Sequence, residues 1–260
     1  MEIAVEVKAI SGISNCHIGT MGWSYVFWEG NFYPKAMRAF DYLKEYAKHF
    51  STVEIDSSFY RIPPAAMVKN WGLQTPPNFL FSAKFPRDIT EVKQFRDAEG
   101  ETEVFLRNMS LLRDKLGVLL VQMPYDFGPE NFSVIKNFLH GLPRGYRYAV
   151  EAKNRKWLDD AFYGLLRENG MALVQADHPW MPDMDTPTAE YVYIRWEGDG
   201  GTVKGTTGQE ERDRKPDIEK WASRIKKYLA EGREVFGYFS KYFSGYSPAD
   251  AEYMIRCLQD

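Results

Sequence analysis

The sequence has 260 residues, enough for one large domain or two small ones, and 44% of them are hydrophobic, so it can fill a large core. The formal net charge of −3 provides no general attraction to nucleic acid or to anionic membranes. No apolar run reaches the ~18 residues that a membrane-spanning helix needs, and the charged first residues do not resemble a secretion signal. We therefore expect a soluble, cytoplasmic protein without a membrane partner.

Eight short apolar segments alternate with stretches of helical spacing along the chain. Most of the gaps between them hold at least ten residues, which is room for a crossover helix. Helical periodicity or capping residues mark residues 35–50, 101–116, 217–229 and 247–258 as helices. The predicted strands cover residues 16–20, 52–55, 80–83, 117–122, 148–151, 172–175, 191–196 and 235–239.

This alternation predicts an α/β protein with a parallel sheet, and eight repeats suit a closed TIM-type (βα)8 barrel. An open, doubly wound sheet is the alternative, but its first turn is usually glycine-rich, and residues 19–24 here are bulky. We expect one barrel domain over residues 1–260. Residues 1–14 form an amino-terminal extension, and the irregular segment 197–216 is either a lid or a mobile loop.

Polar residues follow several predicted strands, at the barrel end where βα loops begin and where barrel enzymes carry their chemistry. Glu54 and Asp56 are two residues apart, share one face of a strand and are expected to point inward. The same reasoning predicts a ring around one mouth made of Glu54, Asp56, Lys84, Glu151, Lys153, Asp177 and Arg195, and places Gln122 at the end of the fourth strand.

Facing carboxylates can divide the roles of acid and base, so Glu54, Asp56, Glu151 and Asp177 are the candidate catalytic residues. Lys84, Gln122, Lys153 and Arg195 are candidate substrate-binding residues, and the cations among them could hold an anionic group. An internal ion-pair network that only satisfies buried charges is the structural alternative.

Aromatic residues follow the first two strands. Trp23, Tyr25 and Tyr60, with Arg61 beside them, could bind a substrate by stacking on sugar or base rings. Loop packing that seals the barrel is the alternative interpretation.

No cofactor is predicted. Of the four histidines only His178 is placed to reach the mouth, so a multi-histidine zinc site is not expected. A Mg²⁺ or Ca²⁺ ion bound by carboxylates alone could still be held there. Cys16 and Cys257 form no metal-type pair, and a disulfide between them is an alternative that a reducing cytoplasm disfavours. No serine-hydrolase, P-loop or zinc-protease motif is present.

The chain resembles the YecE-like family, domain-of-unknown-function family 72, from about Ile18 to Ala251. The resemblance implies a TIM-type barrel, with no activity securely assigned, and a likeness of fold to the endonuclease IV and sugar-isomerase barrels. The segments that carry it include residues 19–25 (Gly-Thr-Met-Gly-Trp-Ser-Tyr), 52–60 (Thr-Val-Glu-Ile-Asp-Ser-Ser-Phe-Tyr), 120–124 (Leu-Val-Gln-Met-Pro) and 193–195 (Tyr-Ile-Arg).

Three strand ends depart from the family pattern. Where the family usually has histidine, this chain has Asn154 after the fifth strand and Glu197 after the seventh. Where the eighth strand typically ends in paired asparagines, it has Ser240 and Lys241. The resemblance therefore implies a divergent member with an altered mechanism or a shifted ligand.

Three functions remain open on the sequence alone. The first is an enzyme acting on a polar or anionic small molecule, sugar-like or phosphorylated. The second is a nucleic-acid-binding or repair protein, against which the acidic balance counts. The third is a non-catalytic ligand-binding barrel. Substrate, reaction and oligomeric state are not determined by the sequence.

Overall fold

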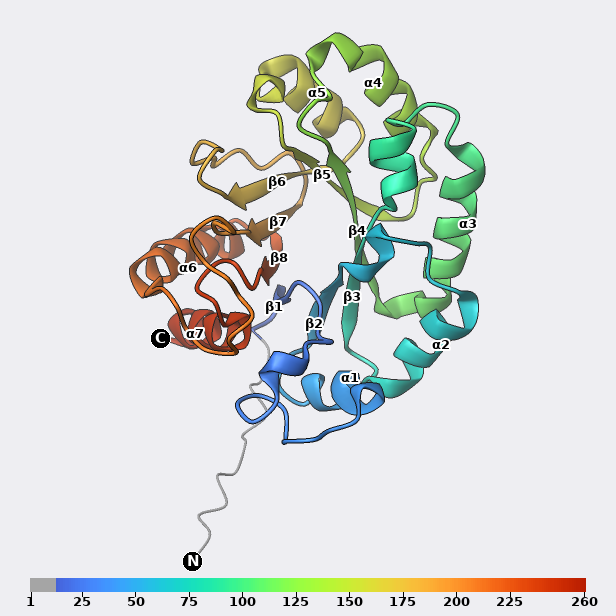
Figure 1. The fold of residues 1–260 in the computed structure, drawn as a ribbon. Coiled ribbons are helices and arrows are strands. Elements are labelled where there is room, and N and C mark those ends of the chain that lie inside the picture. Colours follow the sequence, from blue (N-terminus) through green and yellow to red (C-terminus); the bar gives the residue numbers. More distant parts are fainter. Residues whose placement is uncertain (1–12) are drawn as a thin grey trace, which may run out of the picture.

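A computed structural model of the chain describes residues 13–260, and its eight strands surround a common axis with the helices outside (Figure 1). All paired strands are parallel, and they follow the order β1-β8-β7-β6-β5-β4-β3-β2, so that β8 returns to β1. The predicted TIM-like barrel is therefore confirmed. The strands are β1 (Cys16–Thr20), β2 (Thr52–Ile55), β3 (Leu80–Lys84), β4 (Leu116–Met123), β5 (Arg147–Ala152), β6 (Ala172–Asp177), β7 (Tyr191–Trp196) and β8 (Glu234–Phe239).

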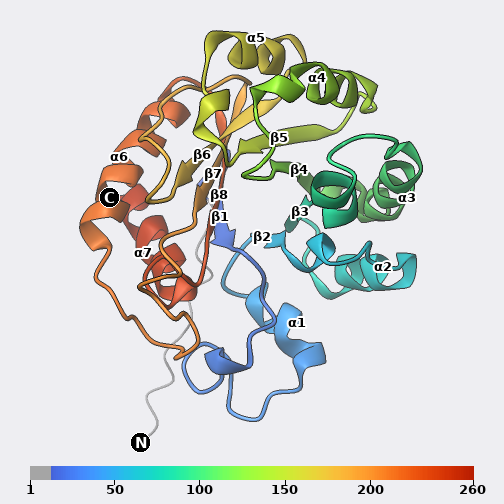
Figure 2. The same cartoon turned by 45° about the horizontal axis from the view of Figure 1, so that its top comes forward.

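The helices form an incomplete outer layer. In Figure 2, α2 to α5 cover one side of the strands, and α6 and α7 cover the other. Within residues 13–260 the connection between β6 and β7 contains no helix, because Pro179, Pro182 and Pro187 interrupt it. The helices are α1 (Tyr42–Tyr46), α2 (Ala65–Gln74), α3 (Glu99–Met109), α4 (Phe132–Gly141), α5 (Asp160–Glu168), α6 (Lys215–Ala230) and α7 (Ser247–Gln259).

Two predicted helices are shorter than expected. The segment 35–50 is α-helical only over Tyr42–Tyr46, after a short 3-10 helix at Ala39–Asp41. Its first residues form a turn, in which the Glu29 side chain accepts hydrogen bonds from the Ala36 amide and the Tyr42 hydroxyl. The segment 101–116 ends as an α-helix at Met109, since Arg113 has a φ of 55° and breaks it before β4.

The barrel closes between β1 and β2 by a mixture of backbone and side-chain bonds. The Gly22 amide donates to the Glu54 carbonyl at 2.8 Å. Lower down, the Tyr46 hydroxyl lies between the strands, accepting from the Thr20 amide at 2.9 Å and donating to the Thr52 carbonyl at 3.0 Å. A Cβ at Gly19 would stand 2.3 Å from that carbonyl oxygen, so this approach requires glycine.

Two apolar clusters follow from the alternation of side chains along the strands. Outward-facing residues pack against the helices in the larger cluster. The smaller cluster fills the barrel, and among its members the Tyr238 hydroxyl bonds the Thr52 and Ser82 hydroxyls at 2.8 and 2.9 Å. The barrel is therefore a packed core below its mouth, with inward-facing residues that include Val118, Leu120, Ala149, Ala172, Val174, Ala176, Tyr191, Tyr193, Phe236 and Tyr238.

Further expectations concerned the amino-terminal extension, the two cysteines and membrane-spanning helices. The predicted extension over residues 1–14 lies almost wholly outside the described residues. Cys16 and Cys257 are both free thiols, so no disulfide joins them. Within residues 13–260, no helix has the length and apolar character needed to cross a membrane.

We predict that Tyr46→Phe lowers the free energy of unfolding by about 1–3 kcal/mol, because it leaves a buried amide and a buried carbonyl between β1 and β2 without their partner. Urea denaturation measures the change. Tyr163→Phe is the matched control, since that half-buried hydroxyl has no hydrogen bond to the described part of the chain. Equal stability of the two variants would contradict the role of Tyr46 in closing the barrel.

Candidate functional site

The centre of the barrel mouth is the guanidinium of Arg195. On β7 the side chains of Tyr191, Tyr193 and Arg195 alternate with outward-facing apolar residues, so all three point into the barrel. Arg195 is 3% exposed and sits above the packed core. A buried guanidinium cannot lose its charge, and so it must be paired.

Glu54 of β2 pairs with Arg195 through both of its oxygens. Arg195 Nη2 lies 3.0 Å from Glu54 Oε1, and Arg195 Nε lies 3.1 Å from Oε2. The Tyr193 hydroxyl donates to the same Oε2 at 2.7 Å. This fully buried carboxylate is saturated by donors, which suits a structural counter-ion.

Two more carboxylates meet on Arg195 Nη1. Glu151 of β5 lies 2.8 Å away and also accepts from Gln122 Nε2 at 2.7 Å. Glu197 forms an ion pair with the same nitrogen. Arg195 with Glu54, Glu151 and Glu197 is called the arginine–carboxylate cluster below.

The cluster separates the pKa values of Glu151 and Glu197. Burial, followed by the charge of Glu151, raises the pKa of Glu197 from 4.5 to about 7. Burial acts in the same direction on Glu151, but Arg195, Lys153 and the Gln122 amide outweigh it and lower the pKa of Glu151. One of the two carboxyls therefore holds a proton near neutral pH while its neighbour stays ionised.

Lysines surround the cluster without entering it. The Lys84 ammonium lies 3.7 Å from the centre of the Phe59 ring, Lys153 lies 5.1 Å from that of Tyr125, and Lys241 lies 4.9 Å from that of Tyr242. None of the three has a carboxylate within 4 Å in the part of the chain that the structure describes. Their ammonium groups therefore form no direct ion pair in the described residues, although Glu151 and Glu197 act on Lys153 through space and raise its pKa.

These groups enclose an open cavity of about 340 Å³, called the mouth cavity. It contains six of the predicted site residues, and Glu54 and Glu151 lie directly beneath it in the cluster. The lining residues are Met21, Tyr25, Asp56, Lys84, Gln122, Lys153, His178, Arg195, Glu197, Gly198, Gly200, Ser240, Lys241 and Tyr242.

The placement of Asp177 in this ring was wrong. Inward positions on β6 belong to Ala172, Val174 and Ala176, so Asp177 faces outward. It accepts from Arg214 Nη2 at 2.9 Å and from Trp221 Nε1 at 2.8 Å, both outside the barrel. In the described part of the chain β6 is followed by a loop without a helix, and polar side chains on the outer face of β6 bond to that loop and to α6.

The expected aromatic rim is only partly present. Tyr25 lines the mouth cavity and donates to the Met21 carbonyl at 2.8 Å. Trp23 is buried against Trp71 and lines a separate cavity of about 400 Å³, together with Arg61. Tyr60 is 68% exposed on the surface. The placement of Trp23 and Arg61 at the mouth was therefore wrong.

Glu197 and Lys241 were not among the predicted site residues. Glu197 follows Arg195 by two positions and so continues the inward face of β7 beyond the strand end. The same parity places Ser240 at the mouth after β8. Extending the alternation one residue past Trp196, the last strand residue, would have found Glu197.

The segment 197–216 is tied to its surroundings at several points. Asn31 Nδ2 donates to the Gly208 carbonyl at 2.8 Å, and the Glu211 amide donates to the Ser244 carbonyl at 2.7 Å. The Gly201 amide donates to Asp199 Oδ1 at 2.9 Å, so the glycine-rich turn already has its own anion. Its first residues form one wall of the mouth cavity.

The carboxylates at the mouth converge on an arginine. Within residues 13–260, no three His, Cys, Asp or Glu side chains are arranged to hold a metal ion. The carboxylates that do converge enclose the Arg195 guanidinium, which already supplies the positive charge a cation would bring.

We predict that the stability difference between Glu197→Gln and the wild type depends on pH. Between pH 4.5 and about 7 the unfolded chain has lost the Glu197 proton while the folded chain retains it, so wild-type stability falls as the pH rises through this window. Glu197→Gln has no such proton to lose, so its free energy of unfolding should rise by on the order of 1–3 kcal/mol relative to that of the wild type as the pH increases through this window. Denaturation at a series of pH values measures this, with the exposed Glu103→Gln as control. Parallel pH profiles would contradict the raised pKa.

Comparison with known proteins places this chain in a family. The family model described as protein of unknown function DUF72 matches residues 17–260. The UPF0759 protein YecE of Escherichia coli K12 is 33% identical over 139 residues, which cover 53% of this chain and 48% of YecE. The UPF0759 protein YunF of Bacillus subtilis 168 is 24% identical over 93% of this chain and 94% of its own length.

Solved structures of DUF72 family proteins share the fold. One from Thermotoga maritima MSB8 has a TM-score of 0.78 at 23% identity, covering 94% of this chain and 99% of that one. One from Enterococcus faecalis V583 has a TM-score of 0.76 at 24% identity, covering 94% and 96%. These likenesses support the fold alone, whereas the family model covers nearly the whole described chain. The chain belongs to the DUF72 family.

Proposed function

We propose that the protein is an enzyme that binds an anionic small molecule in the mouth cavity and transfers a proton through Glu197. The observation that carries the proposal is the division of charge at the mouth. Arg195 is paired with three carboxylates, one of which has a raised pKa, while Lys84, Lys153 and Lys241 have no carboxylate within 4 Å in the described residues.

The charges that line the mouth cavity favour an anion. Four cationic side chains and two carboxylates form its walls, and the other two carboxylates lie beneath it, bound to Arg195. Lys153 and Lys241, from the loops after β5 and β8, both line the mouth cavity, and in this proposal they hold one anionic group. Phosphate and carboxylate groups both fit, because ammonium groups bind either as point charges.

Glu197 supplies the proton chemistry. A carboxyl whose pKa is raised to about 7 can donate and accept a proton with similar ease at neutral pH. Asp56 lines the same cavity and is available as a second base. In this proposal Glu54 and Glu151 hold Arg195, and the acid and base roles fall to Glu197 and Asp56.

A nucleic-acid-binding function has less support. Two of its expected contacts, Trp23 and Arg61, line a separate cavity instead of the mouth. The net charge of −3 also provides no general attraction to a phosphate backbone.

We predict that Lys153→Met and Lys241→Met each weaken binding of a phosphorylated or carboxylated ligand about tenfold, because each removes one ammonium group from the anion site. Calorimetric titration with inorganic phosphate and with a panel of sugar phosphates and carboxylic acids measures affinity. Lys226→Met, an exposed lysine on α6, is the control and should leave affinity unchanged.

Turnover is tested by incubating the protein with the compounds that bind and following their consumption by NMR. Glu197→Gln should abolish consumption while changing affinity little, since it keeps the shape of the side chain but cannot transfer the proton. Binding without consumption by the wild type would leave a non-catalytic barrel. Absence of anion binding would overturn the proposal.

A further inference from the structure

We propose that Lys84 is a nucleophile that forms an imine with an anionic aldehyde or ketone bound in the mouth cavity. The inference rests on the proposed function, since the anion site must hold the substrate, and it names the class of substrate. The argument starts from where the Lys84 side chain is held.

Lys84 is the last residue of β3 and points into the barrel mouth. It is 7% exposed, and it lines the cavity together with Asp56, Arg195 and Glu197. Within residues 13–260 no side-chain acceptor lies within hydrogen-bond distance of its Nζ, although almost every buried ammonium group needs one. A buried amine without a partner inside a ligand cavity is therefore free to bond to the ligand.

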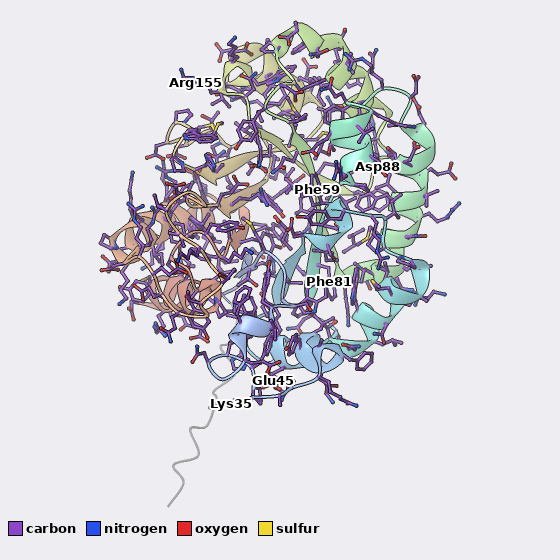
Figure 3. The ribbon with its side chains drawn as sticks, in the orientation of Figure 1. Lys35, Glu45, Phe59, Phe81, Asp88 and Arg155 are labelled. Carbon is purple, nitrogen blue, oxygen red and sulfur yellow. The ribbon has the colours of Figure 1, made fainter. Side chains whose placement is uncertain are left out.

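The ring of Phe59 fixes the position of this amine. Phe59 lies in the turn after β2, near the centre of the molecule in Figure 3, whereas Lys35 and Arg155 lie at its periphery. The Ser58 hydroxyl lies 2.8 Å from the Ile55 carbonyl and 2.7 Å from the Lys84 carbonyl, which ties this turn to the end of β3. The turn then places the Phe59 ring 3.7 Å from Lys84 Nζ.

The surroundings of Lys84 lower the pKa of its ammonium group and so increase the fraction present as the neutral amine. Burial and then the charge of Arg195 lower the pKa of Lys84, and Lys153 acts in the same direction. Asp56 and Glu151 oppose them, as does the Phe59 ring, which favours the charged form. The net result is a lowered pKa, which is the condition for a nucleophilic lysine.

The reaction balances with the groups in the mouth cavity. The lone pair of the neutral amine attacks the carbonyl carbon, and the electrons of the carbonyl double bond move to its oxygen. The amine nitrogen passes one proton to that oxygen, which gives a carbinolamine. Glu197 then protonates the hydroxyl, the C–O bond breaks and water leaves. The remaining N–H proton returns to Glu197, leaving a neutral imine and no net change in the enzyme's protons.

The test traps the imine with cyanoborohydride at neutral pH, using glyoxylate as an anionic aldehyde and propionaldehyde as an uncharged one. Peptide mass spectrometry measures the rate of alkylation at each lysine. We expect glyoxylate to modify Lys84 about tenfold faster than the exposed Lys226, because a lower pKa and the nearby anion site both favour reaction there. Lys84→Arg should lose this adduct and keep the others, with its fold checked by circular dichroism.

A double variant, Lys153→Met with Lys241→Met, separates this inference from the proposed function. It should slow glyoxylate trapping at Lys84 more than propionaldehyde trapping, because the loss of the Lys153 charge raises the Lys84 pKa for both aldehydes, whereas only glyoxylate also loses the anion site. Modification of Lys84 no faster than Lys226 with either aldehyde overturns the imine, and if calorimetry still shows anion binding the proposed function stands. Rapid propionaldehyde trapping without anion binding would support the nucleophile and reject the anion site.

Discussion

The buried ion pairs of Arg195 are the interaction on which the mouth of this barrel depends. One guanidinium from β7 meets carboxylates from β2, from β5 and from the end of its own strand. Such a cluster is stable only when every charge has partners of good geometry, and loss of one partner from a buried pair typically costs about 3–5 kcal/mol. The cluster therefore holds strands on opposite sides of the barrel in one register.

The layers below the cluster prepare this arrangement. The Tyr193 hydroxyl donates to Glu54 from beneath, and Tyr238 bonds hydroxyls of β2 and β3 one layer lower. Between β1 and β2, where the ladder is weakest, the Tyr46 hydroxyl replaces backbone pairing. Aromatic hydroxyls thus connect the polar mouth to the apolar interior and satisfy donors and acceptors that burial would otherwise leave unpaired.

This arrangement also explains how charge is distributed at the barrel mouth. The three carboxylates bound to Arg195 form no ion pair with the lysines around it, and within the cluster the pKa of Glu197 is raised while that of Glu151 is lowered. Lys84 is held between an aromatic ring and this cluster, where solvent and counter-ions are largely excluded. The same cluster that stabilises the mouth therefore leaves three ammonium groups at the cavity without a carboxylate within 4 Å in the described residues, and these groups are what supports the proposals made above.

The sequence by itself determined the strands, the parallel barrel and the end of it at which charges gather, since these follow from periodicity and from the inward alternation of Glu54, Lys84, Glu151 and Arg195. It could not determine which face of β6 carries Asp177, because that carboxylate is bound by residues far away in the chain. It could not determine the length of α1 either, because a hydrogen bond to the Glu29 side chain holds the residues before this helix in a turn. Only the tertiary structure decided which carboxylates share the guanidinium and which lysines stay free. These pairings depend on distances between side chains of strands that are far apart in the sequence, and such distances exist only in the folded barrel.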